Sequence, residues 1–307
     1  MPVCERYQDF DVYSDLNEKQ FRYVYITQNC FYNKLCKYLL SPSMIKAHAS
    51  VNLGITTDFA LEDYREIYDR LIQFIDLEKI FNIDDILDPA IKKVLDEELI
   101  ASTADLRKDK WGRIGEYIFN VLLDTYFELD CIIRKFALNT SPNMPVYGID
   151  TVHCSLKNKC IYFGESKCVS SLANGVALLN KSLEEYEAQI EKEFFTITNQ
   201  NFRRSQTFLD VFSNEILTCF SFREFIEKAQ IKSIGIPVFV AHAGTFDVNT
   251  VFAELRKIKK QQLFGLETSY IVISFPIVDK ENFRTAFIYE ANTQLEEMKK
   301  CIKQYRK

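Results

Sequence analysis

The sequence predicts an α/β fold in which helices flank a mixed β-sheet. Two apolar runs rich in β-branched residues, 233–243 and 269–278, are typical of strands buried within a sheet. Two shorter strand-like runs, 146–156 and 159–168, lie on either side of a turn and predict a hairpin. Helical patterns precede, separate and follow these runs, so strands and helices alternate along the chain, as they do in layered α/β domains.

The first hundred residues form a mixed region. The alternation in 21–28 predicts a strand, and the stretches 30–40 and 61–81 have the apolar spacing of helices. The pattern changes near residue 102. We therefore predict an N-terminal α+β region over 1–100, a candidate partner interface, and a second domain over 101–307 that carries the chemistry described below.

The second domain is predicted to contain several helices in addition to its strands. A helix is expected to begin at a cap on Ser102 or Thr103 and to run to about Leu129. After the hairpin, helices are expected at about 173–195, in part of 196–230, between the two apolar strands near 251–262, and at the charged C-terminus, 292–307.

Composition restricts the class of protein. The chain has 307 residues, of which 47% are hydrophobic and 26% charged, as in ordinary globular proteins. No run approaches the roughly 18 apolar residues of a membrane span, and the N-terminus lacks a signal-peptide core. The nine cysteines show no CxxC spacing, which favours reduced, buried thiols. We expect a soluble, cytoplasmic protein without membrane contact.

The hairpin brings charged side chains together. If Lys157 and Asn158 form its turn, the register places Asp150 opposite Glu165. Side chains repeat with period two along a strand, so Glu165 and Lys167 share the face to which Asp150 also points. A shift of the register by one residue would destroy this convergence. The alternative interpretation is an exposed cross-strand salt bridge on a solvated sheet face.

Two neighbouring carboxylates repel each other at neutral pH, and a divalent cation bound between them removes the repulsion. An all-oxygen ligand set selects Mg²⁺ or Mn²⁺ over zinc. The carbonyl of Ser166 is a further candidate ligand, and Lys167 can orient or deprotonate a metal-bound water. Glu116, on the helix before the hairpin, is expected to join the cluster, with Gly115 permitting close approach of the helix to the sheet.

A family resemblance rests on these same residues. Glu116, the run Gly148-Ile149-Asp150 and the run Gly164-Glu165-Ser166-Lys167 resemble the core of PD-(D/E)xK nucleases, although Ile149 stands where a proline is usual. More narrowly, the segments around them resemble the HamA family, the nuclease subunits of the Hachiman anti-phage system, over roughly residues 100–300. The second Glu-x-Lys, at 297–299, lies in a charged helical pattern without a preceding Asp-bearing strand.

The resemblance implies a function and a partner. It implies a restriction-endonuclease-like core, Asp150, Glu165 and Glu116 as metal ligands, and Lys167 as catalytic base or water-positioning group. It also implies DNA as substrate and a helicase subunit resembling HamB, with no small-molecule cofactor beyond the metal. The net charge of −5 fits a subunit that receives DNA from a partner, because nucleic-acid binding alone usually requires a basic face.

Two other functions remain as alternatives. The first is a catalytically silent adaptor that retains the nuclease fold to bind a helicase or DNA. The second is an unrelated hydrolase that uses paired carboxylates, for example on sugars, which Lys167 beside the pair disfavours. An ATPase activity of its own is not expected, because the sequence contains no GxxxxGK[ST] motif.

Several further residues have more ordinary interpretations. A zinc site of His153, Cys154, Cys160 and Cys168 is disfavoured by the irregular spacing. His153 should point to the face of the hairpin opposite Asp150, and His242 ends a buried strand. Lys181 and the cluster Lys257, Lys259 and Lys260 are expected to be solvated.

Overall fold

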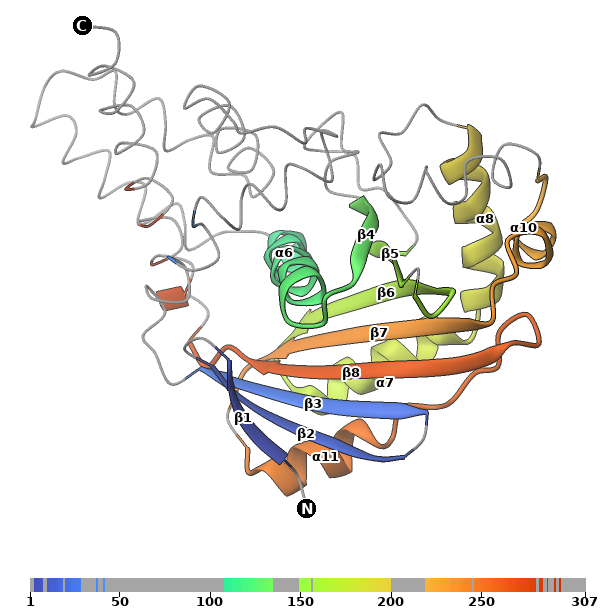
Figure 1. Ribbon diagram of the computed structural model, residues 1–307. Helices are drawn as coiled ribbons and strands as arrows, with labels where there is room; N and C mark the ends of the chain where they lie inside the picture. Colours follow the sequence, from blue (N-terminus) through green and yellow to red (C-terminus); the bar gives the residue numbers. More distant parts are fainter. Residues whose placement is uncertain are drawn as a thin grey trace, which may run out of the picture.

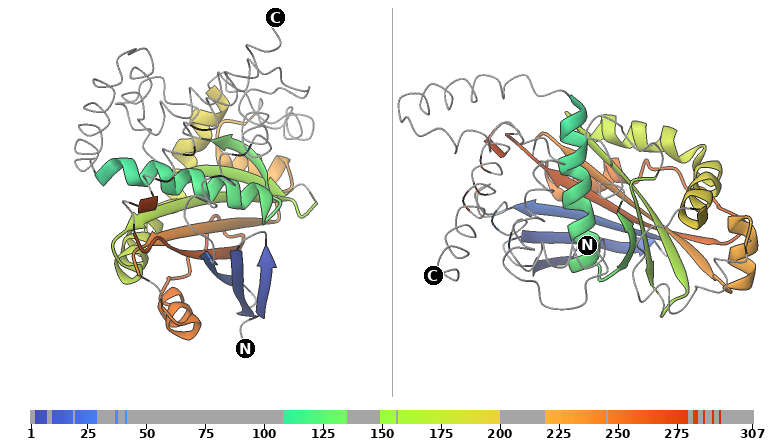
Figure 2. Two further views of the ribbon diagram at one scale, coloured as in Figure 1. Left: turned by 90° about the vertical axis from the view of Figure 1, so that its left-hand side faces the viewer. Right: turned by 90° about the horizontal axis from the view of Figure 1, so that it is seen from above.

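The computed structural model shows one eight-stranded mixed sheet with helices on both faces (Figures 1 and 2). This is the α/β class that the sequence predicts. None of the described helices is long and apolar enough to cross a membrane. The structure describes residues 3–7, 10–18, 20–28, 37, 41, 108–134, 149–155, 157–199, 219–244, 246–279, 282, 283, 286, 290 and 293.

The strand order in the sheet is β1-β2-β3-β8-β7-β6-β5-β4. The four central strands, β3, β8, β7 and β6, run parallel to one another, whereas the pairings toward both ends of the sheet are antiparallel. The bounds are β1 Val3–Tyr7, β2 Phe10–Glu18, β3 Phe21–Gln28, β4 Asp130–Arg134, β5 Thr151–Ser155, β6 Cys160–Val169, β7 Ser233–His242 and β8 Glu267–Pro276.

The N-terminal strands belong to the same sheet as the later strands. The predicted strand at 21–28 is confirmed as β3, and it pairs in parallel with β8. The β1–β2 hairpin was missed by the sequence prediction, although Phe10 and Val12 alternate toward the core on β2. Arg256 forms an ion pair with the buried Asp15 of β2. The boundary predicted at residue 100 lies outside the described residues, but the sheet contains strands from both predicted regions.

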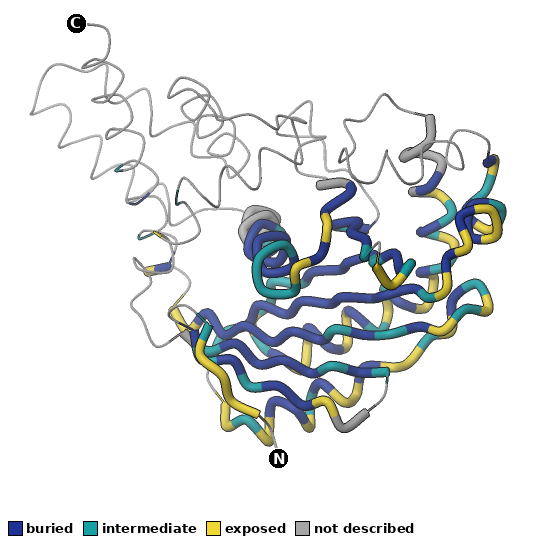
Figure 3. Tube along the Cα trace, in the orientation of Figure 1, coloured by how far each residue is buried: buried dark blue, intermediate teal, exposed yellow. Residues whose placement is uncertain are grey.

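The described helices are α6 Lys108–Thr125, α7 Leu172–Leu183, α8 Tyr186–Asn199, α10 Phe222–Lys228 and α11 Val248–Leu255. Two consecutive residues of β7 show that α6 and α7 cover opposite faces of the sheet. Phe239 stacks against Phe119 of α6, while the side chain of Val240 lies against Gly175 of α7. Because adjacent residues of a strand point to opposite faces, the central strands are buried from both sides (Figure 3).

The helix predicted over 173–195 is in fact two helices. A turn at residues 184–185 separates α7 from α8, and no glycine or proline marks this break in the sequence. The helix predicted near 251–262 begins earlier, where the Asp247 side chain accepts hydrogen bonds from the backbone N–H groups of Asn249 and Thr250, and it ends at Leu255. The predicted helices at 30–40, 61–81 and 292–307 lie almost wholly outside the described residues.

Candidate metal-dependent active site

The hairpin register matches the prediction that places the charged residues together. Thr151 pairs with Gly164 and Ser155 pairs with Cys160, and the turn lies at residues 157–159. Asp150 immediately precedes β5, and its backbone N–H donates to the Gly164 carbonyl at 3.0 Å. One further step of the same register places Asp150 opposite Glu165. The hairpin therefore has the register that the sequence predicts.

The Asp150 carboxylate is held at the edge of β6. Its Oδ2 atom accepts a hydrogen bond from the Ser166 backbone N–H at 2.6 Å and another from the Ser166 hydroxyl at 2.8 Å. These two donors fix the orientation of the carboxylate. The N–H and C=O groups of one strand residue point to the same side. The Ser166 carbonyl therefore points toward the side of β6 on which Asp150 lies.

Glu165 is a buried carboxylate beside a second carboxylate. It is 5% exposed, and burial together with the negative charge of Asp150 raises its pKa to about 7. Lys167 donates to its Oε1 atom, and Lys167 and the nearby Ser182 hydroxyl oppose the rise without cancelling it. Its Oε2 atom is buried and receives no hydrogen bond of ordinary geometry among the described residues, although the Ser182 hydroxyl lies near enough to lower the pKa of the carboxyl group. Such an atom is costly to keep in a folded protein unless something else binds it.

Glu116, on α6, raises the pKa of Lys167 through its negative charge. Burial lowers the pKa of Lys167, but the charges of Glu165, Asp150 and Glu116 together raise it above its ordinary value. Glu116 lies on α6, which packs on the face of the sheet opposite α7. Its negative charge contributes to the raised pKa of Lys167, so its carboxylate lies within electrostatic range of that ammonium group. The predicted set of Glu116, Asp150, Glu165 and Lys167 is thus brought into one neighbourhood.

The alternative of a solvated salt bridge is wrong for this hairpin. Glu165 and Lys167 face α7, because Lys167 pairs with Val240 and the Val240 side chain contacts Gly175 of that helix. Both Glu165 and Ser166 are buried, at 5% and 9% exposure. A surface ion pair would be solvated and weak, whereas these groups lie where charge is energetically expensive.

Close packing of α6 depends on Gly164 more than on Gly115. A Cβ atom on Gly164 would lie 2.5 Å from Thr151 Cγ2 and 2.9 Å from Phe119 Cε1. A Cβ atom on Gly115 would lie 3.4 Å from Cys168 Cβ, close to an ordinary contact distance. The sequence prediction named Gly115, but the missing side chain of Gly164 is what lets α6 approach the hairpin.

The donor set fits a hard divalent cation. Glu116, Asp150 and Glu165 are carboxylates, the Ser166 carbonyl points toward Asp150, and Glu165 Oε2 lacks a partner among the described residues. A cation would satisfy this orphaned oxygen and relieve the repulsion between Asp150 and Glu165. Oxygen ligands without sulfur or imidazole favour Mg²⁺ or Mn²⁺.

The residues set aside in the sequence analysis mostly have structural roles. Burial raises the pKa of Cys154 to about 12 and also raises that of Cys160, as expected for inert thiols. His242 is buried and hydrogen-bonded to Ser274 Oγ at 2.8 Å, and Lys181 is exposed. Lys257 and Lys259 are also exposed and pair with acidic side chains.

His153 points to the face opposite Glu165, as predicted, and is fully buried. There it forms a cluster with Asp124 of α6 and Cys131 of β4 that the sequence analysis missed. The three residues are separated in sequence without regular spacing. Only the pairing of β4 with β5 and the packing of α6 bring them together.

Comparison with known proteins identifies one family. A family model described as HamA matches residues 7–291, and this match begins much nearer the N-terminus than the motif-based resemblance does. The longer match agrees with the structure, in which β1–β3 are part of the same sheet as the nuclease-like core. No curated protein and no solved structure matches the chain. Since the model covers most of its length, the chain belongs to the HamA family, and this membership points to a component of Hachiman anti-phage defence.

Proposed function

We propose that this protein is a metal-dependent DNA nuclease and the effector subunit of a Hachiman defence complex. The observation that carries the proposal is the buried Glu165, which has an oxygen without a hydrogen-bond partner among the described residues, near Asp150 and Lys167. Family membership supports the same assignment. The reaction is the hydrolysis of a phosphodiester bond by a metal-activated water.

Each residue has a distinct role in this proposal. Glu116, Asp150, Glu165 and the Ser166 carbonyl would hold Mg²⁺ or Mn²⁺, which supplies charge neutralisation at the phosphate and a water of lowered pKa. Ser166 holds Asp150 in position through two hydrogen bonds. Without a metal, the surrounding carboxylates raise the pKa of Lys167 above its ordinary value. Beside a bound cation, Lys167 would orient the water or accept its proton and would stabilise charge on the phosphate.

Substrate delivery is assigned to a partner. The net charge of −5 is unfavourable for unaided capture of a polyanion. A helicase subunit resembling HamB would bring DNA to the site and restrain cleavage until it is needed. This part of the proposal rests on the charge balance and on the family.

A cleavage assay tests the proposal. Wild-type protein, alone and with its helicase partner, is incubated with linear and circular DNA in Mg²⁺, in Mn²⁺ and in EDTA. We expect cleavage only with metal. Lys167→Ala should slow it about a hundredfold or more, because a positioned charged group at the reacting centre is lost. Lys181→Ala is the matched control. It makes the same change at an exposed lysine, on α7, and should cleave at the wild-type rate.

The adaptor alternative gives a different pattern. A silent adaptor binds the helicase or DNA but cleaves under no metal or partner condition, and Lys167→Ala leaves binding unchanged. Metal-dependent cleavage that survives in Lys167→Ala, Asp150→Ala and Glu165→Ala alike would show that the activity comes from another site or from a contaminant.

A further inference from the structure

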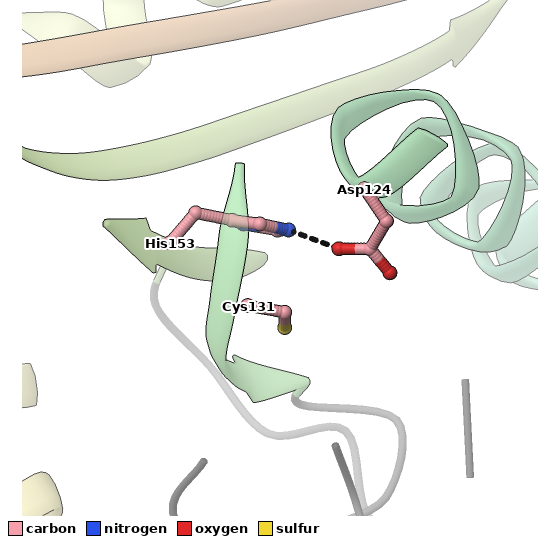
Figure 4. A group of neighbouring side chains, drawn as sticks. All are labelled: Asp124, Cys131 and His153. Atoms are coloured by element: carbon pink, nitrogen blue, oxygen red, sulfur yellow. Dashed lines mark hydrogen bonds and ion pairs between the residues drawn. The ribbon is translucent and has the colours of Figure 1, made fainter. Parts of the chain in front are cut away.

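Three metal-ligating side chains converge beneath α6, on the face of the hairpin that the proposed nuclease chemistry does not use. Asp124 of α6, Cys131 of β4 and His153 of β5 each offer one ligand atom, and these atoms lie within 4.8 Å of one another (Figure 4). His153 is fully buried and Cys131 is 2% exposed. Only Asp124, with 14% of its side chain exposed, reaches toward solvent.

The neighbouring hydrogen bonds determine which nitrogen of His153 carries a proton. The Asn120 amide donates to the Glu116 carbonyl at 2.8 Å, which orients its oxygen toward Thr151. The Thr151 hydroxyl donates its only hydrogen to that oxygen at 2.6 Å. Toward His153 Nδ1, at 3.1 Å, the same hydroxyl must therefore accept, so Nδ1 carries the hydrogen.

This tautomer leaves a lone pair on His153 Nε2. In the neutral ring, Nε2 is an acceptor, yet it lies 3.0 Å from the Asp124 carboxylate oxygen Oδ1. Two acceptors at this distance repel each other unless a positive charge lies with them. The sulfur of Cys131 lies within 4.8 Å of both ligand atoms. A divalent cation would bind the nitrogen lone pair and neutralise one carboxylate and one thiolate.

The backbone of β4 is irregular at this place. Cys131 pairs with His153 across the two strands, and the register shifts between Cys131 and Ile133. Such bulges re-aim side chains and are common beside functional sites. Here Cys131 and Ile132 are adjacent in sequence and both buried, at 2% exposure. The Nδ1–H of His153 has a hydrogen-bond acceptor in the Thr151 hydroxyl, and metal-binding histidines likewise have their second ring N–H held by an acceptor.

We propose that Asp124, Cys131 and His153 bind a zinc ion that joins α6 to the paired strands β4 and β5. A mixed set of one sulfur, one nitrogen and one oxygen ligand suits zinc and does not suit Mg²⁺, and a water molecule completes the tetrahedron. The ion connects the helix that carries Glu116 to the strand that follows Asp150. It therefore holds two parts of the nuclease centre in a fixed relation without taking part in the chemistry.

Metal analysis of the full-length chain tests this site independently of cleavage. Protein produced with added zinc and purified without chelator should contain about one zinc per chain, as for a single site. Cys131→Ser should reduce the zinc content at least tenfold. Cys154→Ser is the matched control. It removes a buried cysteine of β5, the strand that pairs with β4, and this variant should keep its zinc. The double variant Asp150→Asn/Glu165→Gln should also keep it, because its altered carboxylates lie on the other face.

Cobalt supplies a second measurement that does not depend on a folded Cys131 variant. One equivalent of Co²⁺ added to the metal-free wild-type chain should produce a thiolate-to-cobalt charge-transfer band. Thr151→Val should weaken Co²⁺ binding about tenfold or more, as loss of an orienting partner does at other metal sites. A wild-type chain that neither retains zinc nor shows the thiolate band would overturn the proposal and leave a buried imidazolium–carboxylate pair. Zinc that is lost from the double variant but kept by Cys131→Ser would overturn it equally.

Discussion

Replacing Glu165 with glutamine is expected to reduce metal-dependent DNA cleavage by about a thousandfold. Glutamine keeps the shape of the side chain but removes the charge that would bind the metal beside Asp150. The matched control is Glu184→Gln, which changes an exposed carboxylate at the end of α7 and should cleave at the wild-type rate. Cleavage rates on linear DNA in Mg²⁺ measure both effects. Normal cleavage by Glu165→Gln would remove Glu165 from the metal site.

Glu165→Gln lowers cleavage, but in the absence of metal it is expected to increase the stability of the fold at neutral and alkaline pH. The pKa of Glu165 is about 7 in the folded chain, above the ordinary value of 4.5 for a glutamate side chain. A carboxyl group with a raised folded pKa contributes its full stability below about 4.5 and loses it as the pH rises through 7. At pH 8 the buried charge then costs the folded state about 3 kcal/mol relative to low pH. Glutamine does not titrate, so it escapes this cost.

We therefore expect the difference in free energy of unfolding, Glu165→Gln minus wild type, to rise between about pH 4.5 and pH 7 in EDTA and then to level off. Chemical denaturation across this range measures it. Mg²⁺ at pH 8 should raise the melting temperature of the wild type but not that of the glutamine variant. A difference that does not change with pH would mean that Glu165 is not a buried, titrating carboxyl.

Gly164→Ala is expected to destabilise the fold by about 2 kcal/mol. The new Cβ atom would lie 2.5 Å from Thr151 Cγ2 and 2.9 Å from Phe119 Cε1, so a neighbour must move. Thr151 is fully buried, branched at Cβ and hydrogen-bonded to Asn120, which leaves it little freedom to move aside. The strain is therefore expected to push α6 away from the hairpin, and urea unfolding measures the cost.

The displacement of α6 also carries Glu116 away from Asp150 and Glu165. Because catalysis is sensitive to small misplacements, we expect cleavage by the folded Gly164→Ala variant to fall by at least about tenfold. Gly112→Ala is the control on the same helix, since a Cβ atom there meets nothing within 4 Å. It should stabilise the helix by up to about 1 kcal/mol and leave cleavage unchanged. Equal stabilities of the two alanine variants would show that α6 does not pack tightly on Gly164.

The candidate site was predictable because its key relations are local. The period of two along β6 places Glu165 and Lys167 on one face, and the turn near Lys157 sets the register that puts Asp150 opposite them. The association of Glu116 with the cluster was predicted from its place on the helix before the hairpin, and the family resemblance implied the same residue. The break between α7 and α8 was missed because no glycine or proline occupies residues 184–185.

The wider sheet was not predictable in the same way. The pairing of β3 with β8 joins segments that are far apart in the chain, and no local pattern in 21–28 specifies that neighbour. Residues 1–100 were accordingly predicted to form a separate region, although their described strands belong to the same sheet as the later ones. The cluster of Asp124, Cys131 and His153 was missed for the same reason, since three distant segments contribute one residue each.

By itself the sequence determined the alternation of elements, the hairpin register and the identity of the charged residues, because these follow from side-chain periodicity and turn geometry over a few residues. Only the tertiary structure decided that Glu165 is buried and that its pKa rises to about 7, because burial depends on α7 covering that face of the sheet. The tertiary structure likewise decided where α6 packs. Its close approach at Gly164 brings the charge of Glu116 within range of Lys167 and places Asp124 beside His153.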